Sequence, residues 1–270
     1  MPRKHYENFP VASVLLPRHL RRPVGLIYTF ARQADDFADE GELDSSARLE
    51  LLAGFREELD RMSAGAAPAT LLFQELAAMV AERRLPLQPF HDLLDAFSQD
   101  VVKNRYADFD EIMDYCRRSA NPVGLLLLYL YGAATPRNVA YSNAICSSLQ
   151  LINFLQDIAV DYQKGRIYLP LDELEKYRID ETQIARGDTG GQWSAFMHFQ
   201  IARARDLLQA GAPLGKVLKG RIGLEMRMII MGGEAILRKL HQGQGDVFRS
   251  RPILEPLDWA YMFYRAIRAG

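Results

Sequence analysis

Residues 149–161 read Leu149-Gln150-Leu151-Ile152-Asn153-Phe154-Leu155-Gln156-Asp157-Ile158-Ala159-Val160-Asp161. Apolar residues recur through this stretch at helical spacing and predict a long, largely buried helix. Positions three, seven and eleven residues apart share one helix face. The face so defined is polar: Gln150, Asn153, Asp157 and Asp161. A polar stripe on an apolar helix indicates a lined cavity, with hydrogen bonding between helices as the alternative.

A second acidic cluster lies in residues 24–39, which read Val24-Gly25-Leu26-Ile27-Tyr28-Thr29-Phe30-Ala31-Arg32-Gln33-Ala34-Asp35-Asp36-Phe37-Ala38-Asp39. This stretch is also apolar with helical periodicity. Its polar face combines an aromatic residue, a cation and acids: Tyr28, Arg32, Asp35 or Asp36, and Asp39. Two carboxylates about 4 Å apart repel by roughly 4 kcal/mol at an effective dielectric of about 20. We therefore expect a cation to compensate each acidic pair.

Paired carboxylates that face each other across a helical cavity suit a hard divalent cation. Mg²⁺ uses few protein oxygens and completes its coordination with water and substrate phosphates. The alternative for either cluster is a solvated acidic face or a helix N-terminus. The apolar flanks of both clusters argue against that alternative. The sequence thus predicts Mg²⁺ as cofactor and metal-assisted chemistry on a phosphate ester.

A basic loop follows the second cluster. Lys164, Arg166 and Tyr168 carry donors suited to phosphate oxygens, and an arginine can bind them with two parallel hydrogen bonds. Basic residues after a helix also satisfy its last carbonyl groups, which is the alternative reading. Their position directly after Asp161 favours a phosphate site.

The chain of 270 residues, nearly half of them apolar, predicts an all-α protein with a substantial core. We expect about ten helices. Besides short helices after 170, the main ones are expected near 18–40, from Asp44 onward, and at 69–84, 87–104, 109–133, 138–163, 192–210, 214–242 and 255–268. The Gly-rich gap at 187–191 could separate two domains, but helical patterning resumes at once, so we predict one domain over residues 1–270.

Composition excludes several classes of protein. The formal net charge of −1 gives no overall basic field for nucleic acid, so we expect no nucleic-acid partner. Two cysteines and the absence of a signal-peptide pattern or an apolar run of about 18 residues predict a cytoplasmic protein, soluble or peripheral to the inner membrane face. Nucleotide-binding glycine loops, H-E-x-x-H and G-x-S-x-G are absent. The sequence carries no signal for an oligomeric state.

The two acidic stretches, 30–39 and 153–170, together with Tyr115-Cys116-Arg117-Arg118-Ser119-Ala120-Asn121-Pro122-Val123-Gly124, resemble the squalene/phytoene synthase family. The resemblance runs from His5 to near Leu240. It implies an all-α isoprenoid-synthase fold in which the two Asp motifs face each other and bind Mg²⁺ ions that hold a prenyl diphosphate. The implied metal ligands and catalytic residues are Asp35, Asp39, Asp157 and Asp161. The implied contacts of the diphosphate are Tyr28, Arg32, Gln150, Asn153, Lys164, Arg166 and Tyr168, with Asp36 either among them or supporting the ligands.

The chain departs from the general family pattern at three places. His5-Tyr6-Glu7-Asn8-Phe9 replaces a common His-Ser-Lys-Ser-Phe segment, Gln156 replaces an expected Arg, and Val160 replaces an acidic residue. Two cations and one anion are lost. A site with fewer cations is expected to differ from one that holds the two diphosphates of two farnesyl diphosphate molecules together.

Stretches 7–13, 119–124 and 159–161 resemble the bacterial hydroxysqualene synthase branch of hopanoid biosynthesis. This implies ionisation of presqualene diphosphate, rearrangement of the cation and capture by water, without a reductant. One alternative is head-to-head condensation of two farnesyl diphosphates to presqualene diphosphate, squalene or dehydrosqualene. An alternative of another class is a non-catalytic relative that serves as an assembly protein. Greasy substrate and product make peripheral membrane contact a further expectation.

Overall fold

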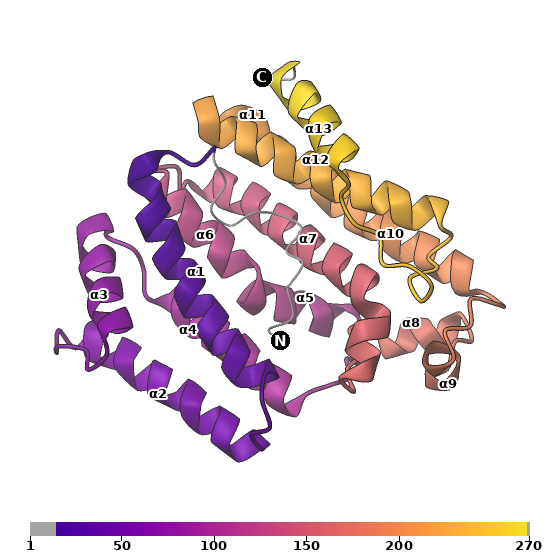
Figure 1. The fold of residues 1–270 in the computed structure, drawn as a ribbon, viewed down its shortest axis with the longest axis horizontal. Helices are drawn as coiled ribbons and strands as arrows, with labels where there is room; N and C mark the ends of the chain where they lie inside the picture. Colours follow the sequence, from indigo (N-terminus) through magenta and orange to yellow (C-terminus); the bar gives the residue numbers. More distant parts are fainter. Residues whose placement is uncertain (1–14, 269–270) are drawn as a thin grey trace.

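The computed structural model describes residues 15–268, and every regular element in that range is a helix (Figure 1). The elements are α1 (Arg18–Asp39), α2 (Ser45–Ser63), α3 (Leu71–Arg83), α4 (Gln88–Val102), α5 (Phe109–Ser119), α6 (Asn121–Leu130), α7 (Pro136–Gln163), α8 (Leu171–Lys176), α9 (Glu181–Ala185), α10 (Trp193–Gly211), α11 (Leu214–Val217), α12 (Gly220–Gln242) and α13 (Pro256–Arg268). The predicted all-α class is confirmed.

The long helix α7 occupies the middle of the molecule (Figure 1). Its start follows from local sequence: the side chain of Thr135 accepts a hydrogen bond from the amide of Asn138 at 3.3 Å, and Pro136 sits in the first turn. Buried apolar residues of α7 pack against α6, α10 and α12. This packing fixes α7 along its length and therefore fixes the direction in which its acidic face points.

Two hydrophobic clusters make up the interior. One joins the inner faces of α1 to α4, with Phe30 at its centre in edge-on contact with Phe73 and Phe90. The other contains residues of α5 and of all the helices from α7 through α13. Helix α6 connects them, because Leu126 belongs to the first cluster and Leu128 to the second. The two acidic helices, α1 and α7, thus belong to different clusters. Helix α6 contacts both of them and so fixes their relative position.

Two of the predicted helices are wrong in extent. The predicted helix 109–133 is two helices, α5 and α6, because Pro122 has no amide hydrogen and can start a helix but not continue one. The predicted helix 214–242 is also two, α11 and α12, because the backbone is extended at Leu218 and Lys219. The described part of the chain holds thirteen helices rather than about ten.

The predicted start of the second helix is confirmed. The side chain of Asp44 accepts a hydrogen bond from the amide of Ala47 at 2.9 Å and caps α2. An N-cap of this kind stabilises a helix by about 1 kcal/mol. In this helix Leu52 and Leu59 are buried and Leu49 and Phe55 are half-buried, and together they form one apolar stripe. The cap and the stripe together orient α2 toward α4.

Gly211 sets the approach of α10 to α7, and its replacement by Ala is expected to destabilise the fold. A Cβ atom there would lie 2.6 Å from the backbone oxygen of Tyr141, which cannot move without shifting α7. We expect a loss of about 1–3 kcal/mol, seen as a lower melting temperature in calorimetry. Gly54→Ala on α2 is the matched control, since a Cβ there meets nothing within 4 Å. An unchanged melting temperature for Gly211→Ala would contradict this account.

Candidate functional site

The last turns of α1 and α7 carry acids and no bases, although the C-terminal end of a helix is negatively polarised and favours cations. On α1, Asp36 and Asp39 lie in the last turn and Asp35 just before it. On α7, Asp161 lies in the last turn and Asp157 one turn earlier. Within α1, Arg32 contacts Asp36 at 2.6 Å and Asp35 at 3.4 Å. Both helices therefore place negative charge where it is least favourable, which indicates a functional rather than a stabilising role.

The loop after α7 joins the two acidic ends. Gly165 adopts a left-handed conformation with φ of 79°, and the amide of Arg166 donates to the carbonyl of Asp161 at 2.8 Å. This turn brings Lys164 and Arg166 onto Asp39, where both form ion pairs. Both side chains therefore bind an acid of α1, which goes beyond satisfying the last carbonyl groups of α7. The C-terminal ends of α1 and α7 are thus held together through Asp39.

Asp100 was not predicted from the sequence, and it lies behind this ion-pair cluster. The hydroxyls of Tyr115 and Tyr168 donate to its carboxylate at 2.6 and 2.8 Å. Arg166 donates to the backbone oxygen of Asp100 at 3.2 Å, and the ring of Tyr168 stacks on Phe154 at 4.2 Å. Its only sequence signal was an acid in the last turn of the amphipathic helix α4. The position of Arg166 therefore depends on α1 through Asp39, on α4 through Asp100, and on α5, whose Tyr115 holds Asp100.

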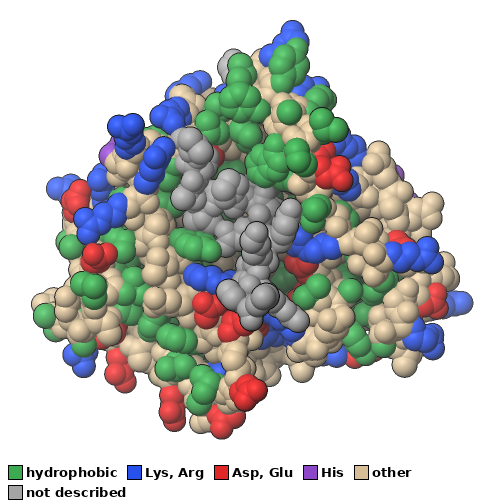
Figure 2. All heavy atoms as spheres, in the orientation of Figure 1, with side chains coloured by type: hydrophobic (Ala, Val, Ile, Leu, Met, Phe, Trp, Pro, Cys, Tyr) green, Lys and Arg blue, Asp and Glu red, His purple; other side chains and the backbone are tan. Residues whose placement is uncertain are grey.

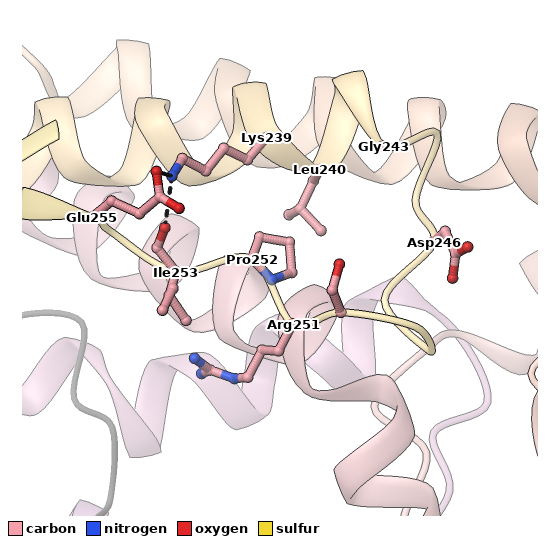
Figure 3. A pocket seen from close by; sticks show the side chains of 9 residues that line it. Lys239, Leu240, Gly243, Asp246, Arg251, Pro252, Ile253 and Glu255 are labelled. Atoms are coloured by element: carbon pink, nitrogen blue, oxygen red, sulfur yellow. Dashed lines mark hydrogen bonds and ion pairs between the residues drawn. The ribbon is translucent and has the colours of Figure 1, made fainter. Parts of the chain in front are cut away.

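Arg251 is the second residue that sequence reasoning missed. It lies between α12 and α13, and its guanidinium group pairs with Asp157, with Nη2 at 3.1 Å from Oδ2. Figure 3 shows this side chain pointing away from Lys239, toward the helix below. Lys239 holds the same segment by donating to the carbonyl of Ile253 at 2.9 Å. Only the fold could reveal Arg251, because it lies 94 residues from Asp157 in the chain and matches no motif.

Gln156 also contacts this segment. Its buried side chain donates to the carbonyl of Pro252 at 2.6 Å. The predicted loss of a cation at position 156 is therefore offset in space, because Arg251 brings a guanidinium group to the neighbouring Asp157. Val160, the other replaced position of this helix, is exposed. The segment His5-Tyr6-Glu7-Asn8-Phe9, on which the remaining departure rests, lies outside the described residues.

Tyr28 lies in the wall of an apolar cavity of about 220 Å³. Ala31 lines the same cavity and precedes Asp35 by one helical turn, so the acidic end of α1 adjoins the cavity. On α7, Gln150 is half-buried and lies two turns before Asp157, and Asn153 is exposed and lies one turn before it. The walls come from α1, α6, α12 and residues adjoining the first two of these helices: Leu16, Val24, Ile27, Tyr28, Ala31, Val123, Leu127, Tyr131, Ile222, Glu225, Met226 and Ile229.

The acids differ in their electrostatic state. Burial, followed by repulsion from Asp157, raises the pKa of Asp161 to about 7. Burial, followed by repulsion from Asp39, raises the pKa of Asp35 to about 6. Burial also opposes ionisation of Asp39, but hydrogen bonds and charge from Lys164 and Arg166 lower its pKa overall. Asp35 and Asp161 thus carry negative charge that the surrounding side chains do not fully compensate.

These residues fit a divalent cation in donor chemistry. All four carboxylates are hard oxygen donors, and the raised pKa values of Asp35 and Asp161 show that added positive charge would be favourable there. Across residues 15–268, no three His, Cys, Asp or Glu side chains yet form a group that could hold a metal ion. Instead Lys164 and Arg166 neutralise Asp39, and Arg251 neutralises Asp157. A metal ion would have to share or displace these contacts.

The thermal stability of the metal-free protein is expected to fall as pH rises from about 4 to about 7. Asp161 and Asp35 bind their protons more tightly in the folded chain than at the unfolded value of 3.8. Their stabilising contribution is therefore complete below 3.8 and is lost as pH approaches the folded values of about 6 and about 7. Calorimetry across this range checks the trend. Asp161→Asn should weaken the dependence of the melting temperature on pH. A wild-type melting temperature that rises throughout this range would contradict the raised pKa values of Asp35 and Asp161.

Known proteins resemble this chain over most of its length. The squalene/phytoene synthase family matches residues 2–258. A hydroxysqualene synthase of Rhodopseudomonas palustris is 36% identical over 264 residues, which cover 97% of this chain and 88% of the relative. A phytoene synthase of Arthrospira platensis is 31% identical over 261 residues, covering 92% of this chain and 84% of that protein.

Two solved structures share the fold. The squalene synthase HpnC from Alicyclobacillus acidocaldarius has a TM-score of 0.82 and 35% identity, with 90% of each chain covered. A dehydrosqualene synthase in complex with ligand has a TM-score of 0.87 at 20% identity, covering 98% of this chain and 92% of that one. The predicted isoprenoid-synthase fold and the resemblance stated from the sequence are confirmed. The chain belongs to the squalene/phytoene synthase family, whose members are synthases that use prenyl diphosphates.

Proposed function

We propose that this protein is a Mg²⁺-dependent enzyme that converts presqualene diphosphate to hydroxysqualene and diphosphate. The observation that carries the proposal is the junction of two acidic helix ends, through Asp39, Lys164 and Arg166, beside an apolar cavity. Relatives named hydroxysqualene synthase, from Rhodopseudomonas palustris and Sinorhizobium fredii, are 36% and 33% identical to the chain. They support this reaction over others in the family.

The polar end of the site would bind the diphosphate. Asp35, Asp39, Asp157 and Asp161 would hold Mg²⁺, which when bound offsets the negative charge of the departing diphosphate. Among the cations already at this end are Arg32, Lys164, Arg166 and Arg251. Arginine can grip phosphate oxygens with two parallel hydrogen bonds. We assign Tyr168 and Asp100 the role of positioning Arg166, because both contact the same buried cluster.

The apolar cavity, at about 220 Å³, would hold part of the hydrocarbon. Ionisation breaks the carbon–oxygen bond to diphosphate, the cyclopropylcarbinyl cation rearranges, and water adds its oxygen to the final cation and releases one proton. Tyr28 and Tyr131 line the cavity, and an aromatic face stabilises positive charge by about 2 kcal/mol in a dry site. These steps together consume no reductant, because water supplies the electrons of the new carbon–oxygen bond. Gln150 and Asn153 on α7 complete the proposed substrate contacts, with Asp36 beside the metal ligands.

Head-to-head condensation is the rival reaction, and the phytoene synthase of Arthrospira platensis at 31% identity is the observation that favours it. Two separate incubations of pure protein with Mg²⁺, one with presqualene diphosphate and one with farnesyl diphosphate, distinguish the two. We expect hydroxysqualene from the first substrate, without NADPH, and no product from the second. Presqualene diphosphate or dehydrosqualene formed from farnesyl diphosphate would support condensation instead.

A non-catalytic assembly protein is a rival of another class. Such a protein has no need for acids at the negative ends of two helices, and this chain has them at both. Calorimetric titration with inorganic diphosphate in the presence and absence of Mg²⁺ provides the test. Binding that requires Mg²⁺ is expected for an enzyme. Failure of the folded protein to bind diphosphate under either condition would revive the assembly role.

We also propose that the enzyme works in the cytoplasm in peripheral contact with the inner membrane face. Its substrate and product are both too apolar to leave a bilayer readily. Within residues 15–268, no helix is both long and apolar enough to cross a membrane. Fractionation of cells that produce the protein would test this: we expect it with membranes at low salt and released by high salt. Recovery entirely in the soluble fraction at low salt would contradict it.

A further inference from the structure

Helix α13 is attached to the body of the protein along one face only. Its buried residues Met262 and Ala266 pack against α12. Arg227 of α12 donates to the carbonyl of Ala266 at 2.8 Å, and Lys239 pairs with Asp258 at 2.7 Å. These contacts fix the rotation of α13 and therefore define which of its side chains point outward.

The outward face of α13 is also apolar. Leu257, at 82% exposure, Tyr261 and Tyr264 follow one another at helical spacing. The exposed apolar side chains of this helix are Leu257, Tyr261, Phe263, Tyr264 and Ile267. A helix that is apolar on every side is normally buried, whereas a surface helix has a polar outer face. Hydrophobic side chains gather at the top of Figure 2, where Figure 1 places α13.

The charges on α13 are asymmetric. Its only acid is Asp258, which is engaged by Lys239 on the inner side. The exposed charges are Arg265 and Arg268. Arg265 donates to the hydroxyl of Tyr261 at 3.2 Å, and the guanidinium of Arg268 lies 5.4 Å from the ring centre of Tyr264. The outer face thus combines leucine, isoleucine, aromatic rings and cations, which is the composition of helices that lie in a membrane interface.

We propose that the outward face of α13 docks on the surface of a lipid bilayer that contains anionic lipids. Two arginines without an acid on the same face complement negative headgroups. A second copy of this chain fits less well, since two such faces would bring only cations together. Tyrosine rings suit the boundary between headgroups and acyl chains, because each has an apolar body and a polar tip.

The position of this face suits a membrane enzyme. Helix α12, which carries α13, also supplies Ile222, Met226 and Ile229 to the apolar cavity. Docking through α13 would therefore hold the wall of the cavity close to the lipid bilayer that supplies the apolar substrate. The inference identifies the surface behind the membrane contact proposed above, and it does not depend on which family reaction the site performs.

Co-sedimentation of the protein with vesicles tests the proposal. We expect binding to vesicles of phosphatidylcholine mixed with phosphatidylglycerol, and much weaker binding to phosphatidylcholine alone. The double variant Tyr261→Ser with Tyr264→Ser should bind roughly tenfold less, because the apolar area inserted sets the affinity. Leu71→Ser with Val102→Ser is the matched control, since both residues are exposed apolar residues on other helices. Arg265→Gln with Arg268→Gln should abolish the preference for the anionic lipid.

Two results would overturn the proposal. One is equal vesicle binding by wild type and the tyrosine variant. The other is a wild-type dimer in sedimentation that the tyrosine variant converts to monomer, which would make this face an interface between copies. Circular dichroism checks that each variant is folded. Turnover of detergent-solubilised substrate should be the same in wild type and the α13 variants, so failure of membrane docking and failure of the proposed reaction are separate outcomes.

Discussion

Asp157→Asn is expected to lower turnover of presqualene diphosphate by more than roughly a hundredfold while leaving the fold intact. Groups that only support metal ligands change activity by about 10- to 100-fold, and a ligand itself should exceed that range. Asn keeps the shape of the side chain but removes the charge that Mg²⁺ needs. Asp157 also loses its pairing with Arg251, but both side chains are 27% exposed, so we expect at most about 1 kcal/mol from that loss.

Initial rates at saturating Mg²⁺, together with circular dichroism, measure the effect of Asp157→Asn. Asp114→Asn on α5 is the matched control, because Asp114 also pairs with arginine but lies on an exposed surface. The control should retain wild-type turnover. If Asp157→Asn lost its helical signal, the residue would be structural. If it kept full turnover, the metal assignment on α7 would be wrong.

Arg166→Met is expected to destabilise the protein by roughly 3 kcal/mol, because it leaves Asp39 with only one of its two cations in a largely buried site. Arg166 is 15% exposed and Asp39 is 17% exposed, so water can replace little of the lost interaction. The same change removes the hydrogen bond to the backbone oxygen of Asp100. At about 2–4 °C per kcal/mol, the melting temperature should fall by roughly 6–12 °C.

Arg117→Met provides the comparison for Arg166→Met. Arg117 also pairs with an aspartate, but it is 60% exposed and its partner Asp114 retains Arg118. Exposed pairs contribute about 0–1 kcal/mol, so the melting temperature of this variant should barely change. Equal melting temperatures for the two variants would show that the cluster around Asp39 does not hold the ends of α1 and α7 together.

The placement of the candidate acids on two helices could be predicted from local sequence. The helical spacing of Asp35 with Asp39, and of Asp157 with Asp161, placed each pair on one face, and α1 and α7 have that geometry. The loop residues Lys164 and Arg166 were predicted to bind phosphate oxygens. The structure pairs both with Asp39, an acid 125 residues from Lys164. Periodicity orients side chains around one helix, but it does not reveal which distant helix they meet.

Arg251 and Asp100 show what the sequence could not provide. Arg251 belongs to an irregular segment that lies against α7 because Gln156 and Lys239 bind its carbonyl groups. Asp100 differs from a surface acid only because Tyr115 and Tyr168 enclose it, and burial raises its pKa to about 6. Both depend on tertiary contacts between segments without periodic patterns. The breaks between α5 and α6 and between α11 and α12 were missed because apolar spacing continues across them.

In the proposed reaction the acidic junction ionises presqualene diphosphate and water terminates the reaction. The most direct measurement is incubation of pure protein with presqualene diphosphate and Mg²⁺, without NADPH, in water enriched in oxygen-18, followed by mass spectrometry of the product. We predict hydroxysqualene whose hydroxyl oxygen carries the heavy isotope. An alcohol without the label, squalene, or no turnover would contradict the account.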